Sequence, residues 1–145
     1  MANEQDQKLS DLTDADELRL RDQRAVVEAY LQNEDAKQKY QTAAGKLGIV
    51  RAILGANVFT PDQTYELQCL GVVFGDAFVQ EMELEWTMVE DEYGRDPAVW
   101  VPGTSIILFP LTIISKRIER GEPVDVFDLF NNAAAKVADL KQQGS

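Results

Sequence analysis

Histidine is absent from this chain of 145 residues, and cysteine occurs once, at Cys69. Without histidine, the chain cannot build a His general base, a Ser-His-Asp triad or a His-ligated metal site. One cysteine excludes an internal disulfide and a thiolate zinc site, and its apolar context, "YELQCLGVVFG", predicts a buried thiol in a reducing compartment. The nucleotide signatures G-x-x-x-x-G-K-[ST] and G-x-G-x-x-G are also missing. We therefore expect no cofactor, no metal site and no familiar catalytic residue set.

Basic residues are scarce, with 14 lysines and arginines against 25 aspartates and glutamates, which gives a net charge of -11. Such a charge repels nucleic acid phosphates and anionic membrane surfaces, so we expect neither as a partner. It favours solubility, and it also accelerates the encounter with a basic protein partner. Both interpretations of the charge stay open.

Long apolar runs are missing too. The most apolar stretch, "AVWVPGTSIILFPLTII", is interrupted by Pro102, Gly103 and Pro110, which argues against a membrane span. The N-terminus, "MANEQDQKLSDLTDADE", lacks the basic and apolar regions of a signal peptide, so we expect a cytoplasmic location. The length, the 45% hydrophobic content and the lack of a Pro-rich or Ser-rich linker predict a single domain over residues 1–145.

Helical periodicity dominates the first half of the chain. Residues 1–12 are polar and are expected to fray. Thr13 is the predicted N-cap of a first helix that ends near Asn33, and a second helix is predicted over residues 35–56. The third helix is expected to begin at "TPDQ", where Thr60 caps, Pro61 fits the first helical position and Gln63 completes a capping box.

The third helix contains two glycines, Gly71 and Gly75, that lower its intrinsic helix propensity. Their four-residue spacing removes bulk along one line of the helix surface. We therefore predict that another element approaches this helix closely, rather than that the glycines bind phosphate.

The hydrophobic period changes after Met82. Residues 84–88 alternate as in a strand with one buried face, and "PAVWVPG" and "TSIILFP" are short β-type segments bounded by Pro and Gly. A helix is predicted from Pro110 to a cap at Gly121, and Asp125 is the predicted cap of a last helix with a frayed tail. The predicted fold class is α+β, with three N-terminal helices, a small three-stranded antiparallel sheet and two C-terminal helices.

The segment "MVEDEYGRDPAVWV" is the predicted hairpin between the first two strands. It contains the carboxylates Glu90, Asp91, Glu92 and Asp96. A solvated turn is the simplest interpretation of such a charge run. A solvated turn would not separate the pKa values of two carboxylates, as acid-base catalysis requires. The four carboxylates also lack the ligand spacing of an EF-hand calcium site. Trp86 and Trp100, on the two flanking strands, are ordinary core aromatics or, alternatively, a partly exposed pair beside an acidic rim. In the second case Trp100, Tyr93 and Arg95 would be anchors of a recognition surface.

The segment "SKRIER" holds the densest basic group, with Lys116, Arg117 and Arg120 on the predicted fourth helix. Cations near a helix C-terminus complement the helix dipole, which is the simplest interpretation. Two others remain: binding of a carboxylate or phosphate, and internal pairing with the hairpin acids Glu90, Asp91 or Asp96.

Several motifs together carry a family resemblance: Trp86, "VEDEYGRDPA", "WVPG", "FPLTIISKRIERGEPVDV" and the final helix. With these, the chain resembles an uncharacterised bacterial domain family, the domain of unknown function 3806. The resemblance covers roughly the C-terminal two thirds, residues 60–141, and leaves out the two N-terminal helices. Because the family has no established activity, the resemblance implies membership and no function.

The expected function is that of a small acidic binding protein without catalytic activity, which contacts a basic protein partner through the acidic and aromatic hairpin. A bacterial toxin-neutralising immunity protein is one specific form of this function. Two alternatives are an enzyme of unfamiliar type, using carboxylates with Lys116 or Arg117 in a cleft, and a homo-oligomeric structural domain.

Overall fold

The computed structural model describes residues 7–144 of the chain. These residues form six helices and one four-stranded antiparallel sheet with the strand order β1-β2-β3-β4, so the α+β class is confirmed. The elements, in chain order, are β1 (Lys8–Ser10), α1 (Asp14–Glu28), α2 (Glu34–Lys39), α3 (Ala43–Gly55), α4 (Thr64–Met82), β2 (Glu85–Asp91), β3 (Gly94–Trp100), β4 (Ile107–Leu108), α5 (Pro110–Glu119) and α6 (Val126–Gly144).

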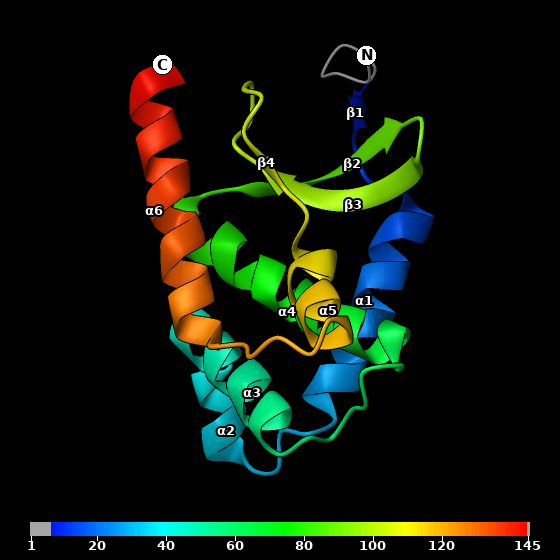
Figure 1. The fold of residues 1–145 in the computed structure, drawn as a ribbon, viewed down its shortest axis with the longest axis vertical. Helices are drawn as coiled ribbons and strands as arrows, with labels where there is room; N and C mark the ends of the chain where they lie inside the picture. The colour runs from blue at the N-terminus through cyan, green and yellow to red at the C-terminus, as the bar shows by residue number, and fades with distance from the viewer. Residues whose placement is uncertain (1–6, 145) are drawn as a thin grey trace.

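Helix α4 lies at the centre of the molecule, with the sheet above it, α1 and α6 at its two sides and α2 and α3 below (Figure 1). Its side chains Leu67, Leu70, Phe74 and Phe78 are fully buried. The rings of Phe78 and Phe130 stack with their centroids 4.4 Å apart, which ties α4 to α6. Because burial of each large apolar side chain stabilises the fold by about 1.5–3 kcal/mol, α4 supplies much of the driving force for folding.

The close approach predicted at the two glycines of α4 is confirmed. A Cβ atom on Gly71 would lie 2.5 Å from the Cα atom of Leu111, and one on Gly75 would lie 2.7 Å from the Trp86 ring. Helix α5 and strand β2 therefore pack directly against the backbone of α4. The absence of two side chains sets how closely the sheet and α5 can approach the central helix.

The prediction of a frayed N-terminus is wrong for Lys8–Ser10, which pair with Met88–Glu90 as a fourth strand, β1. The Thr87 hydroxyl donates to the Ser10 carbonyl at 3.0 Å, which adds a side-chain hydrogen bond between β2 and β1. Three residues are too few to show the two-residue alternation of a strand. Strand β1 is stable because it pairs with the neighbouring edge of β2. Residues 1–6 lie outside the described part of the chain.

The helix predicted over residues 35–56 is two helices. The chain turns at residues 40–42, where the Thr42 hydroxyl accepts from the Gly45 amide at 2.9 Å and caps α3, while Asn33 caps α2. Threonine competes with the helical backbone for hydrogen bonds, and here it starts a new helix. Helix α1 also ends earlier than predicted, at Glu28.

The start predicted for the third helix, with Thr60 as the cap and Pro61 as the first helical residue, is wrong by three residues, since α4 begins at Thr64. Only one half of the expected capping box forms: the Thr60 amide donates to Gln63 Oε1 at 2.7 Å, while the Thr60 hydroxyl bonds the side chains of Asp62 and Gln63. The motif therefore closes a turn that precedes the helix.

Other local predictions are confirmed. Thr13 and Asp16 form a capping box at the start of α1, and the Asp125 carboxylate accepts from the Asp128 amide at 3.0 Å at the start of α6. Pro110 is the first residue of α5, and Gly121 follows that helix with a φ of 75°. Within residues 7–144, no helix combines the length and the apolar character needed to cross a membrane.

Candidate functional site

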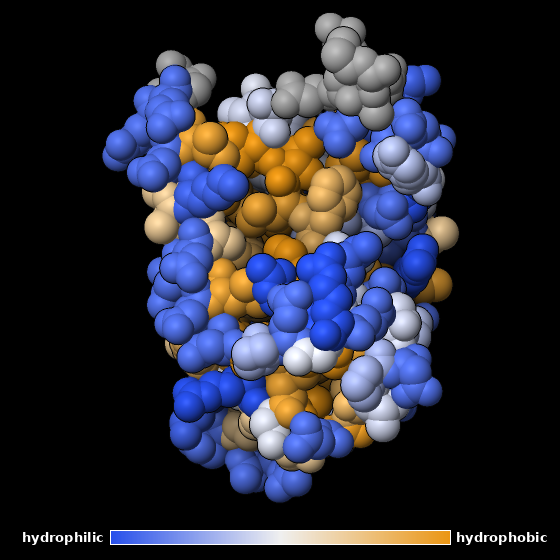
Figure 2. Space-filling model, in the orientation of Figure 1, coloured by the Kyte–Doolittle hydropathy of each residue, from blue (hydrophilic) through white to orange (hydrophobic). Residues whose placement is uncertain are grey.

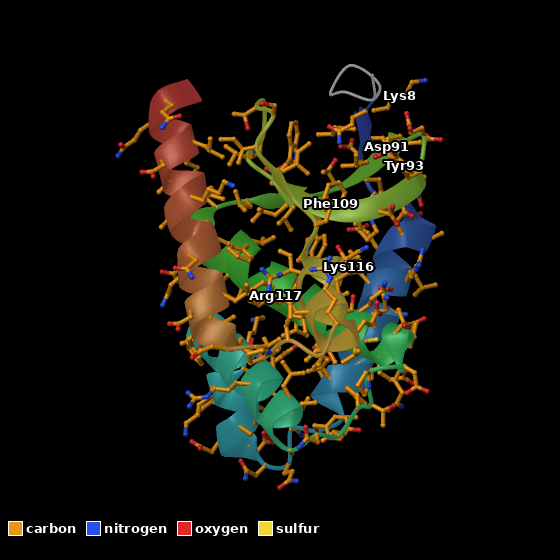
Figure 3. The ribbon with its side chains drawn as sticks, viewed as in Figure 1. Lys8, Asp91, Tyr93, Phe109, Lys116 and Arg117 are labelled. Carbon is orange, nitrogen blue, oxygen red and sulfur yellow. The ribbon has the colours of Figure 1, made fainter. Side chains whose placement is uncertain are left out.

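The acidic segment forms the hairpin of β2 and β3, in which Asp91 pairs with Gly94 around a turn at Glu92 and Tyr93. Gly94 has a φ of 131°, which favours glycine, and Asp91 Oδ1 accepts from the Tyr93 amide at 2.8 Å. The turn projects the Tyr93 side chain away from the protein, with 82% of its surface exposed. Figure 3 shows Asp91 and Tyr93 together at the tip of the hairpin.

An ion pair braces the hairpin against the start of α1. Arg95 donates Nη1 to Asp16 Oδ1 at 2.8 Å and Nη2 to Asp16 Oδ2 at 2.7 Å. The pairing holds the pKa of the Asp16 carboxyl well below its ordinary range, first through the hydrogen bonds from Arg95 and then through the Thr13 amide. A bidentate pair fixes orientation as well as distance, so the hairpin has a defined direction relative to α1.

The two tryptophans do not form an exposed pair beside the turn. Trp86 pairs with Val99, and Trp100 pairs with Glu85, so the rings lie on opposite faces of the sheet. Trp86 faces α4, where its indole Nε1 donates to Asp76 Oδ1 at 2.9 Å. Trp100 lies on the other face and is partly exposed.

The four carboxylates do not converge on one point. Glu90 and Glu92 are exposed, Asp91 is engaged in the turn, and Asp96 lines a cleft below the hairpin. In the described part of the chain, no group of three or more His, Cys, Asp or Glu side chains is arranged to hold a metal ion. The tip therefore offers a dispersed acidic surface around Tyr93.

The internal pairing considered for the basic helix is not formed. Arg117 donates Nη1 to the Ile113 carbonyl of its own helix at 3.1 Å, and Arg120 lies 3.7 Å from Glu122. Lys116 is exposed and makes no hydrogen bond or ion pair within residues 7–144. Since Glu90 and Asp91 belong to the far end of the hairpin, helix α5 does not reach them.

A cleft of about 290 Å³ brings together two of the predicted site residues, Asp96 and Lys116. Arg19 of α1 and Gln68 of α4 also line it, although no sequence pattern distinguishes either residue from its neighbours. Their convergence depends on how α1, α4, β3 and α5 meet in space. A cleft between the hairpin and the helices was expected for an enzyme, and this cleft has both charge signs.

Sequence reasoning missed a polar cluster that joins α1, α4 and β2. Arg24 donates Nε to Asp76 Oδ2 at 2.5 Å and Nη2 to Oδ1 at 2.8 Å, and Trp86 is the third donor. The Asp76 carboxylate raises the pKa of Arg24, while burial opposes the shift. Asp76 is the only charged residue of "LQCLGVVFGDAFV", and a lone carboxylate in an apolar helix was the available signal for a buried partner.

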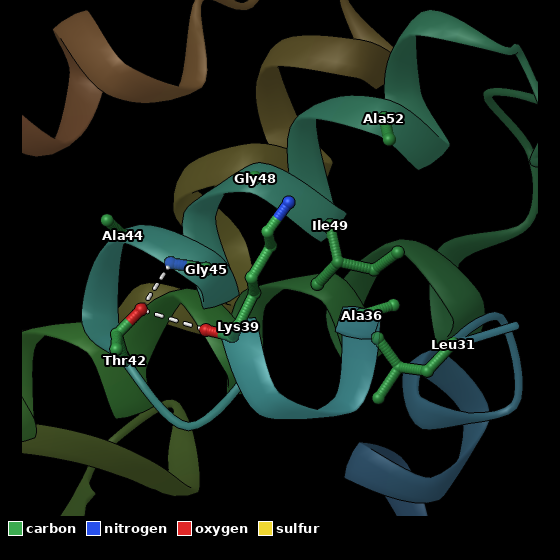
Figure 4. A pocket seen from close by; sticks show the side chains of 9 residues that line it. All are labelled: Leu31, Ala36, Lys39, Thr42, Ala44, Gly45, Gly48, Ile49 and Ala52. Carbon is green, nitrogen blue, oxygen red and sulfur yellow. Dashed lines mark hydrogen bonds between the residues drawn. The ribbon is translucent and has the colours of Figure 1, made fainter. Parts of the chain in front are cut away.

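Two further depressions are apolar. A groove of about 480 Å³ lies along α2 and α3 and is shown in Figure 4; its lining includes Leu31, Ala36, Ala44, Gly48, Ile49 and Ala52. The other, of about 360 Å³, lies between β4 and α6 and includes Ile106, Leu108, Ala133, Val137 and Leu140. Figure 2 shows apolar side chains over β4 beside α6. Neither groove gathers groups for chemistry.

The fold has a counterpart among solved structures. A crystal structure of a protein from Bacteroides thetaiotaomicron VPI-5482, at 1.50 Å resolution, superposes with a TM-score of 0.69 and 14% sequence identity. The similarity covers 88% of this chain and 47% of that chain, so this chain spans about half the length of its neighbour. At this identity the likeness shows a shared fold alone.

Sequence comparison identifies the family. No curated protein matches the chain at a significant level. A family model described as a domain of unknown function matches residues 46–130, which extend from α3 into α6. This match confirms the resemblance seen at the hairpin and the basic helix, and it begins earlier than "TPDQ". The chain therefore belongs to the DUF3806 family of domains of unknown function.

Proposed function

We propose that this protein binds another protein through the tip of the acidic hairpin. The observation that carries the proposal is Tyr93, an aromatic side chain with 82% exposure at the end of a braced turn. Tyrosine is enriched at energetically important positions of interfaces, and a surface already held in place loses less entropy on binding. Glu90 and Glu92 beside it, with a net charge of -11 over the whole chain, favour a basic partner.

Affinity capture from the source cell's lysate, followed by identification and purification of the captured protein, tests this function. We expect Tyr93→Ala and the double variant Glu90→Gln/Glu92→Gln to lose the partner, and binding to weaken as salt increases. The matched control is Glu34→Gln/Asp35→Asn on α2, which removes the same charge from another exposed surface. A partner that binds all three variants equally would place the interface elsewhere.

A specific form of this proposal is a toxin-neutralising immunity protein, in which the acidic surface covers a basic nuclease or similar effector. Small size and strong negative charge support it. Here the captured partner is a basic toxin, and co-expression of the chain relieves its toxicity. A captured partner whose activity is unchanged by the chain would exclude this form.

The cleft favours a second candidate function, that of an enzyme using Asp96 with Lys116, because both residues line it. The assay is conversion, followed by NMR, of compounds that bind the cleft, with Asp96→Asn as the inactive comparison. If such compounds are recovered unchanged, the chain is not an enzyme for them.

The two apolar grooves favour a third candidate, a homo-oligomeric structural domain. Light scattering over a range of concentrations measures this directly. A monomeric mass at every concentration would contradict it.

A further inference from the structure

Four polar side chains from different parts of the sequence line the cleft between β3 and α5. Arg19, Gln68, Asp96 and Lys116 come from four elements and meet around a volume of about 290 Å³. Within residues 7–144, none of these four side chains makes a hydrogen bond or an ion pair. Arg24 and Arg95, in contrast, both have bidentate carboxylate partners.

The charge of the cleft differs from that of the chain. Arg19 and Lys116 contribute two positive charges and Asp96 one negative charge, in a protein with a net charge of -11. Two cations on different helices, α1 and α5, can hold one anionic group between them. Asp96 pairs with neither of them, so its carboxylate remains available to accept from a donor on the same ligand.

The rest of the cleft wall is mostly apolar, with Phe109 half-buried and Leu111 buried, and it includes Thr112, whose hydroxyl donates to the Phe109 carbonyl at 3.3 Å. Figure 3 shows Lys116 below Phe109, on the face where apolar side chains over β4 adjoin hydrophilic side chains over α5 in Figure 2. A concave surface with an apolar wall and a few convergent polar groups is the usual form of a small-molecule site. Isolated solvated lysines and arginines on a convex surface lack this arrangement.

We propose that the cleft binds a small amphoteric compound: a carboxylate or phosphate held by Arg19 and Lys116, and an ammonium group held by Asp96. A compact apolar part of the ligand would contact Phe109 and Leu111. The volume is slightly below the roughly 300–1,000 Å³ of most ligand pockets, which limits the ligand to the size of an amino acid or a phosphorylated amine. This inference rests on the cleft and not on the function proposed for the hairpin tip.

Titration of the ¹⁵N-labelled full chain, followed by amide chemical shifts, tests the site. The probes are L-leucine, which has a carboxylate, an ammonium and an apolar part, and phosphoethanolamine, in which phosphate replaces the carboxylate. Leucinol lacks the carboxylate, and 4-methylpentanoate lacks the ammonium. We expect at least one of the first two probes to shift cleft amides saturably at millimolar concentration. Its relatives that lack one charged group, which are leucinol and 4-methylpentanoate for leucine and ethanolamine for phosphoethanolamine, should bind clearly more weakly. The identity of the tighter probe distinguishes a carboxylate from a phosphate ligand.

Variants separate the roles of the charged side chains. Arg19→Gln and Lys116→Gln should each weaken binding by about tenfold or more, the usual effect of losing a charged hydrogen bond. Asp96→Asn should weaken binding of the ammonium compounds and leave 4-methylpentanoate unaffected or more tightly bound. The matched control, Arg21→Gln, removes an exposed charge from the same helix outside the cleft. All four positions are exposed, so the variants are expected to fold.

Two results would overturn the proposal. One is the absence of saturable shifts at cleft amides with both amphoteric probes. The other is binding that Arg21→Gln weakens as much as Lys116→Gln, since that would reflect net charge instead of the cleft. Neither result bears on the hairpin, which the capture experiment measures separately.

Discussion

The contact between α4 and α5 predicts how the chain responds to a single added methyl group. Gly71→Ala places a Cβ atom 2.5 Å from the Leu111 Cα atom and 2.6 Å from the Pro110 carbonyl oxygen. Favourable carbon contacts lie at about 3.5–4.0 Å, so the helices must separate by about 1 Å. Because both neighbouring atoms belong to the backbone, no side-chain rotation can relieve the overlap.

The control is Gly48→Ala in the middle of α3, where an added Cβ atom meets nothing within 4 Å. Both substitutions improve helix propensity by about 1 kcal/mol. Gly48→Ala should therefore raise the free energy of unfolding by about that amount. At Gly71 the same gain is opposed by overpacking, which typically costs about 1–3 kcal/mol and occasionally more. Because the overlap is with backbone atoms, we expect a cost at the upper end of this range, so the free energy of unfolding of Gly71→Ala should fall by about 2 kcal/mol.

Gly75→Ala should fall between these two variants, because its nearest neighbours, at 2.7 Å, are side-chain atoms of Trp86 and Pro110 that can shift. Urea unfolding followed by circular dichroism measures all three free energies. For a chain of this size, 1 kcal/mol corresponds to roughly 2–4 °C in Tm, so the extremes should also separate in a thermal scan. Equal stability of Gly71→Ala and Gly48→Ala would refute the close packing of α5 on α4.

Three further predictions concern titration and buried polar groups. The lowered pKa of Asp16 stabilises the fold at neutral pH, and this contribution disappears as the pH falls below about 4 towards the lowered pKa. Arg95→Ala should therefore reduce the free energy of unfolding at pH 7 and make it fall less steeply with acidification. The control, Arg21→Ala, should leave the dependence of the free energy of unfolding on pH unchanged. Burial raises the pKa of the Cys69 thiol to about 11, so a thiol reagent at pH 8 should react roughly 100-fold more slowly with the native chain than with the unfolded chain; equal rates would contradict burial. The amide of Gln23, 1% exposed, has no hydrogen-bond partner among the described residues, so Gln23→Met should increase the free energy of unfolding by about 1 kcal/mol, while a decrease would indicate a bound water.

Local structure was predictable where neighbouring residues decide it. Thr13 caps α1 with a residue three positions away, and Pro110 begins α5 because its missing amide donor costs nothing there. The glycines of α4 were a signal of a different kind. Their low helix propensity required a compensating contact, although the sequence did not identify α5 and Trp86 as the elements that provide it.

Structure that depends on distant partners was not predictable. Strand β1 is stable because β2 offers it an unpaired edge, and residues 8–10 have no pattern of their own. Among the candidate site residues, the hairpin tip followed from the turn sequence, whereas the cleft joins Arg19 and Lys116, which are nearly a hundred residues apart in the chain. The opposite faces of Trp86 and Trp100 depend on the strand register, which a shift of one residue would reverse.

The Asp16 carboxylate takes part both in the capping box of α1 and in the ion pair with the hairpin. It accepts from the Thr13 amide at 2.9 Å and also from Nη1 and Nη2 of Arg95. The first turn of α1 and the hairpin, 79 residues apart in sequence, therefore share one group. Fraying of that turn and loosening of the hairpin should occur as one local opening event. A molecule that grips the hairpin would thus slow amide hydrogen exchange at the start of α1, far from its own contacts.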